Sequence, residues 1–168
     1  MAEWISVYCR QPIRLDGDAI RRWIEEADLP TLAEGFYDDD ESATAAADSA
    51  EATLRVDDGE VVEVHWQESG RPLRISAGSA VTEEISEILD EVLDDAVGPG
   101  PDTIRDHLAG VRQVIHIEMS ASDSLSMGAV LGEVIALELA AAGTGLVWFF
   151  GKEWVSGRDR AGTIWTGE

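Results

Sequence analysis

An almost uninterrupted apolar run, Leu125–Phe150, constrains the fold of this chain more than any other segment. The residues 143–145, Gly-Thr-Gly, divide it into two elements. Residues 124–142 are apolar on nearly every side at helical spacing, so a helix there needs cover from most directions. Residues 146–150 are five consecutive apolar residues, which suits a central strand buried on both faces. We therefore expect a central helix followed by an interior strand.

Two glutamates, Glu133 and Glu138, argue against a membrane span in this run. A charged side chain at the bilayer centre costs about 2.5–3.5 kcal/mol on insertion scales. Residues 1–11 also lack the basic start and long apolar stretch of a secretory signal. We therefore expect a cytoplasmic protein with no membrane partner.

The rest of the chain alternates between strand and helix patterns. Period-two alternation predicts strands over 3–10, 52–56, 61–66 and 111–119, and Asp58-Gly59 predicts a hairpin turn. Segments with helical spacing lie between them. The fold class expected is α+β: an antiparallel or mixed sheet of about 6 strands with helices packed largely on one face.

With 168 residues, the chain is long enough to bury one core, so we expect a single domain over 1–168. Residues 37–51 are small and acidic and show no periodic apolar pattern. That composition is typical of a mobile surface loop, and we expect one there.

The charge is strongly unbalanced, with 34 acidic residues against 12 basic ones and a net charge of −22. Nucleic acids and anionic membranes would be repelled, so neither is expected as a partner. Compositional bias or salt adaptation would also produce an acidic surface. The total charge excludes partners without assigning a function.

The acidic charge is densest in Ser79–Val97, a segment with helical spacing. One side of that helix is apolar, whereas the other carries only carboxylates: Glu83, Glu84, Glu87, Asp90, Glu91, Asp94 and Asp95. Like-charge pairs at i,i+4 each cost roughly 0.2–0.5 kcal/mol, and anions oppose the helix dipole at a C-terminus. A helix selected only for folding would carry some Lys. This face therefore predicts a binding surface for a cationic partner.

Two pairs of a histidine and a carboxylate form a second candidate site. Glu63 with His65, and His116 with Glu118, are two residues apart on expected strands, so each pair shares one face of a sheet. If the two strands are neighbours, the four side chains form a donor set that suits zinc or non-haem iron. Polar residues on a solvated sheet face would show the same spacing, and both interpretations stay open.

Motifs for covalent catalysis and for cofactors are absent from the sequence. There is no Gly-x-Ser-x-Gly, and the serines over 120–126 suit the capping of a helix. Cys9 is the single cysteine, which excludes an intramolecular disulfide and a cysteine-based zinc site. No cofactor is therefore expected, and the balance favours a protein that is not an enzyme.

These features favour a small acidic protein-binding module. An inhibitor or immunity-type protein that neutralises a basic partner, such as a bacterial nuclease-like toxin, would use an acidic face to steer the encounter. Two alternatives stay open: a metal- or small-ligand-dependent enzyme using the face of His65 and His116, and a subunit that self-associates through its Trp-rich C-terminal edge. The oligomeric state is not decided by the sequence.

Overall fold

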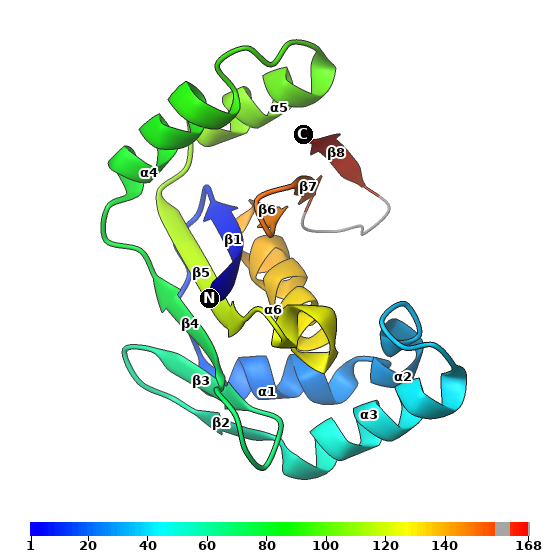
Figure 1. Ribbon diagram of the computed structural model, residues 1–168. Coiled ribbons are helices and arrows are strands. Elements are labelled where there is room, and N and C mark those ends of the chain that lie inside the picture. The colour runs from blue at the N-terminus through cyan, green and yellow to red at the C-terminus, as the bar shows by residue number, and fades with distance from the viewer. Residues whose placement is uncertain (157–161, 168) are drawn as a thin grey trace. The chain divides into compact units, whose positions relative to one another are not determined.

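The structure, a computed structural model, describes residues 1–156 and 162–167 (Figure 1). Within these residues the fold is α+β, with six α-helices and one antiparallel sheet of eight strands in the order β2-β3-β4-β5-β1-β6-β7-β8. The strands are β1 (Ala2–Cys9), β2 (Arg55–Asp57), β3 (Val62–His65), β4 (Leu73–Ala77), β5 (Gln113–Ser120), β6 (Gly145–Phe149), β7 (Glu153–Ser156) and β8 (Thr163–Thr166). The expected class is confirmed. The sheet is larger than the expected six strands.

The helical elements fall in three groups along the chain, after β1, after β4 and after β5. They are α1 (Gly17–Glu26), α2 (Leu29–Ala33), α3 (Asp40–Thr53), α4 (Val81–Glu87), the π-helical turn η1 (Ile88–Val92), α5 (Pro99–Leu108), the 3-10 turn η2 (Asp123–Leu125) and α6 (Met127–Gly143). Within the described part of the chain, no helix has both the length and the apolar character needed to cross a bilayer.

The chain divides into two compact units, each assembled from three separate stretches. Unit 1 comprises Met1–Trp4, Leu15–Ser76 and Ile117–Ile135. Unit 2 comprises Ile5–Arg14, Ala77–His116 and Ala136–Glu168. The acidic segment belongs to unit 2 as a whole.

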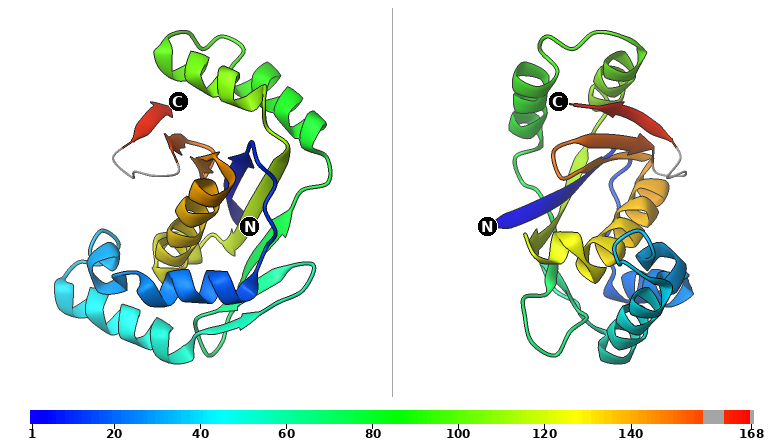
Figure 2. Two further views of the ribbon diagram at one scale, coloured as in Figure 1. Left: turned by 180° about the vertical axis from the view of Figure 1, so that it is seen from behind. Right: turned by 45° about the vertical axis from the view of Figure 1, so that its right-hand side comes forward.

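In unit 1, residues 37–51 are not a mobile loop: the expectation is wrong, because α3 occupies most of that stretch. The Asp39 carboxylate caps this helix, accepting hydrogen bonds from the backbone N–H of Ser42 at 2.7 Å and from its hydroxyl at 3.0 Å. Ala43, Ala47 and Ala50 form a buried stripe, and α2 and α3 lie side by side in both views of Figure 2. Alanine has the highest helix propensity but gives only a weak apolar pattern. The helix is therefore easy to overlook in the sequence.

In unit 2, helices cover both faces of the strands, so the expectation of helices largely on one face is wrong for this unit (Figure 1). Successive residues of a strand point to opposite faces. Tyr8 of β1 packs into a core with residues of η1 and α5, including Ile88 and Leu108. Its neighbour Cys9 faces α6, where a Cβ added to Gly143 would come within 2.7 Å of the Cys9 Sγ. Within unit 2, the end of α6 (136–143) therefore covers one face of the strands, and α4, η1 and α5 cover the other.

The expected interior strand is confirmed. In the sheet, β6 lies between β1 and β7, in register with Ile5–Cys9 on one side and Glu153–Ser156 on the other. The tryptophans of this region are inside rather than forming an aromatic surface. Trp154 is fully buried and stacks on the half-buried Trp148 with ring centroids 5.1 Å apart. The aromatic content of the C-terminal edge therefore serves the core of unit 2.

Candidate functional site

The acidic segment folds as α4 followed by the π-helical turn η1. The N–H of Leu93 closes the π turn by donating to the carbonyl of Ile88 at 3.0 Å. Ile88 and Leu93 are buried in the core of unit 2, against residues of α5 and the strands. The apolar side of the helix is thus used for packing, which leaves its other side for the solvent.

Six of the seven predicted partner-binding residues are exposed along α4, η1 and the turn that follows. They are Glu83, Glu87, Asp90, Glu91, Asp94 and Asp95, and we call these six the acidic ridge. None of them makes an ion pair with an Arg, Lys or His of the described residues. Leu89, 36% exposed, lies in the same stretch as an apolar contact point. The ridge is a concentration of carboxylates that the described chain does not neutralise.

The seventh residue, Glu84, turns inward and ties the first turn of α4 to the sheet. Its Oε1 is 2.6 Å from Nε2 of His116 on β5, and Nδ1 of His116 is 2.9 Å from the hydroxyl of Ser6 on β1. With the imidazole proton on Nε2, the ring donates to Glu84 and accepts from Ser6. A Cβ added to Gly78 would come within 3.3 Å of the Glu84 Oε2, so this corner is tightly packed.

Tyr8 extends the same set of contacts into the core. Burial raises the pKa of its phenol far above the ordinary value, a hydrogen bond with Ser6 acts in the opposite direction, and the nearby charge of Glu84 raises it further. Tyr8 therefore stays a neutral donor. The hydrogen bonds run from β1 through His116 to the carboxylate of α4.

Serine, histidine and glutamate in one hydrogen-bonded set are also the side chains of an acyl-transfer triad. Here Ser6 is only 7% exposed and is held between Tyr8 and His116. A nucleophile has to reach a substrate carbonyl, which this hydroxyl does not do. The arrangement anchors α4.

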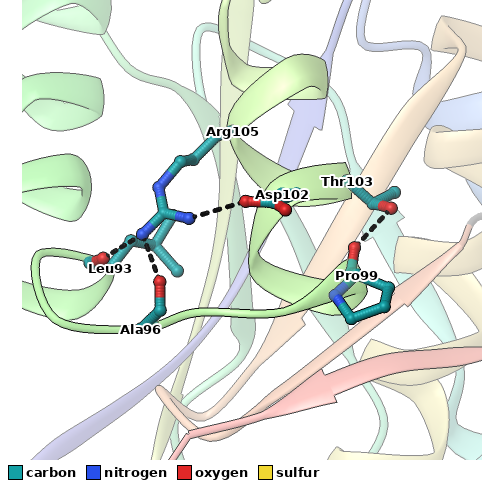
Figure 3. Close-up of polar contacts among 6 residues, drawn as sticks. All are labelled: Leu93, Ala96, Pro99, Asp102, Thr103 and Arg105. Carbon is teal, nitrogen blue, oxygen red and sulfur yellow. Dashed lines mark hydrogen bonds and ion pairs between the residues drawn. The ribbon is translucent and has the colours of Figure 1, made fainter.

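The other end of the acidic segment is held by Arg105 of α5 (Figure 3). Its guanidinium donates to the backbone carbonyls of Leu93 and Ala96 and forms an ion pair with Asp102 at 3.0 Å. Carbonyls at the C-terminal end of a helix lack helical partners and carry the negative end of its dipole, so a cation is favourable there. Arg105 is thus engaged by the backbone and by Asp102, and leaves the ridge uncompensated.

The residues of the predicted metal site have other partners. His65 Nε2 is 3.2 Å from an Asp57 carboxylate oxygen, at an ion-pair distance but without hydrogen-bond geometry. Glu63 and Glu118 both lie near Arg74, at 4.0 and 3.9 Å, and His116 contacts Glu84. Across residues 1–156 and 162–167, no group of three or more His, Cys, Asp or Glu side chains is placed to hold a metal ion. The zinc or iron interpretation gains no support from this arrangement.

Comparison with protein-family models, with curated proteins and with solved structures finds no match to this chain. The functional argument therefore depends on the site itself.

Local sequence patterns do not single out Ser6, Tyr8 and Arg105 as parts of this site. Nothing in the sequence places Ser6 next to His116, which is 110 positions away. Arg105 did leave a signal, because it is the only Lys or Arg between Arg74 and Arg112. A lone cation in an acidic stretch is a natural candidate for a structural partner.

Proposed function

We propose that this protein binds a basic protein through the acidic ridge, as an inhibitor or immunity-type module that covers a cationic surface such as the nucleic-acid site of a nuclease-like toxin. The observation that carries the proposal is the exposure of six carboxylates on one helical segment with no cation of the described chain against them.

The two anchors of the segment support this proposal. Arg105 and His116 are in contact with the segment, and they bond the backbone carbonyls of Leu93 and Ala96 and the Glu84 carboxylate instead of the ridge. A surface that only had to be stable would gain from a Lys at one of these positions. Retained like charge on a fixed scaffold is instead favourable for steering a cationic partner and for fast association.

Leu89 adds an apolar contact to this electrostatic surface. Stable interfaces combine an apolar centre with a polar rim, and Leu89 is exposed among the ridge carboxylates. We therefore expect the partner to place an apolar side chain on Leu89 and basic side chains around it.

The test compares two doubly charge-reversed variants with equal net charge. E87K/E91K reverses two ridge residues, whereas E26K/E51K reverses two exposed residues on α1 and α3. Each immobilised protein is used for capture from native lysate at low and at high salt. We expect one basic protein to be retained by the wild type and by E26K/E51K at low salt, and to be lost from E87K/E91K. Its association rate should fall about tenfold or more on ridge reversal.

Equal losses in the two variants would show that only net charge matters. Retention by E87K/E91K would show that the ridge is not the contact surface. Either result would refute the proposal.

A further inference from the structure

Unit 1 contains a pocket whose lining has the opposite charge to the rest of the chain. Its volume is about 180 Å³, and the residues that define it are Ala2, Arg71, Pro72, Arg74, Glu118, Met119 and Ser120. These residues lie at the start of β1, at the start of β4 and at the end of β5. Two arginines against one glutamate give the lining a net charge of +1, in a protein whose net charge is −22.

Arg71 has donors available for a ligand. Within the described residues it makes no ion pair and no side-chain hydrogen bond. Its backbone is held in place, because Pro72 restricts the preceding residue to extended conformations. Gly70, at φ 123°, makes the turn just before it, where a Cβ would clash with the Gln67 side chain. The Arg71 guanidinium is therefore carried on a restrained stretch of backbone.

Arg74 is only loosely engaged by its carboxylate neighbours. Its nitrogens lie 4.0 Å from Glu63 and 3.9 Å from Glu118, whereas tight charge-assisted hydrogen bonds are about 2.7–2.9 Å long. A ligand carboxylate can therefore bond to this guanidinium without first breaking a short ion pair. The planar fork of arginine matches the two oxygens of a carboxylate.

The rest of the lining sets the size and the character of the ligand. Ala2, Pro72 and Met119 supply apolar surface beside the two guanidinium groups. Pockets for drug-sized ligands measure about 300–1,000 Å³, so this one suits a molecule of a few heavy atoms. A dianion such as phosphate would be repelled by Glu118 of the lining, and by Glu63 beside Arg74, more strongly than a monoanion would.

From these observations we infer that the pocket is a binding site for a small organic monocarboxylate, whose oxygens pair with Arg71 and Arg74 and whose short apolar tail contacts Pro72 and Met119. This inference is independent of the acidic ridge, which belongs to unit 2.

The experiment is an NMR titration of the isotope-labelled full chain with sodium propionate at constant ionic strength. Propionamide, which has the same shape without the charge, is the control probe. We expect saturable shifts with propionate, concentrated on the backbone amides of Arg71, Met119 and Ser120, and no comparable shifts with propionamide. R71A should weaken binding about tenfold or more, as expected for the loss of a charge-assisted contact. R22A, which removes an exposed arginine of α1 in the same unit, should leave it unchanged.

A third variant tests the charge argument from the opposite direction. E118Q removes the competing carboxylate and should tighten propionate binding several-fold. Each of these results would overturn the inference: no saturable shifts, equal binding of propionamide, unchanged binding in R71A, equal loss in R22A, or weaker binding in E118Q.

Discussion

Replacing Arg105 with methionine should destabilise the acidic segment strongly. Met keeps most of the apolar stem and removes the guanidinium, which leaves the carbonyls of Leu93 and Ala96 without this donor. Hydrogen bonds to charged groups contribute about 1.5–3 kcal/mol each. Arg105 is about one-third exposed, so solvent reduces the two contacts to about 2–4 kcal/mol together. The ion pair with Asp102 adds little, because that carboxylate is 70% exposed.

The assay is urea and thermal unfolding of R105M, with R112M as the matched control. Arg112 is exposed, and its side chain has no partner among the described residues, so R112M should stay within about 0.5 kcal/mol of the wild type. For a chain of this size, 2–4 kcal/mol corresponds to a Tm about 5–15 °C lower. D102N should have a much smaller effect than R105M.

Amide hydrogen exchange gives a local readout of the same change. In R105M, exchange should accelerate in η1 and the turn after it before it does so in α3. If R105M matched R112M in stability and exchange, the contacts with Leu93 and Ala96 would not hold the end of the segment, and the reasoning would be wrong.

Two further predictions follow from perturbed ionisation. Burial raises the pKa of the Cys9 thiol to about 11, so less of it is thiolate at pH 8 than in the unfolded chain. From the thiolate fractions at that pKa and at the ordinary value, its reaction with a disulfide reagent at pH 8 should be roughly 200-fold slower than in urea-unfolded protein. Equal rates in the folded and unfolded protein would contradict this. Burial lowers the pKa of His107, opposed by its hydrogen bond with the Tyr8 carbonyl and assisted by the charge of Arg10. The unfolded chain therefore binds the proton more readily, and the stability that His107 contributes is present above pH about 6.5 and is lost as the pH falls through the folded pKa. H107Q should flatten the decline in unfolding free energy below pH 7, and a wild-type advantage that grew in acid would refute the assignment.

Local patterns predicted some elements correctly and missed others for identifiable reasons. The apolar run gave α6 and β6 correctly, because no polar face was available to meet water along them. The acidic ridge was also predictable, since amphipathic spacing alone places carboxylates opposite Ile88 and Leu93. By contrast, α3 was missed because its buried stripe consists of alanines. Alanine side chains are small, so their spacing gives little apolar signal and the segment resembles a loop in composition.

The anchors of the segment depend on contacts distant in the sequence. Periodicity assigns Glu84 to the acidic face with its neighbours, and only the position of α4 against β5 shows that it bonds to His116. Likewise, two histidine–carboxylate spacings were visible in the sequence, but the actual partners, Asp57 and Glu84, lie on other elements. Spacing along a strand therefore identified polar residues correctly and their partners wrongly.

The discontinuous make-up of the two units has a consequence for how the chain folds. Ile5 of β1 pairs with Phe149 of β6, so the central pairing of unit 2 closes a loop that spans most of the chain. Folding is slow when a long loop has to close before its ends gain stabilising contacts. We therefore expect this chain to fold slowly and to complete neither unit while only its first half has been synthesised. The segment with the acidic ridge also depends on the rest of unit 2, because a short, like-charged helix is only marginally stable on its own in water. A peptide of 79–97 would therefore be a poor substitute for the protein, and a truncated chain that lost β6 would present the same carboxylates on no fixed scaffold.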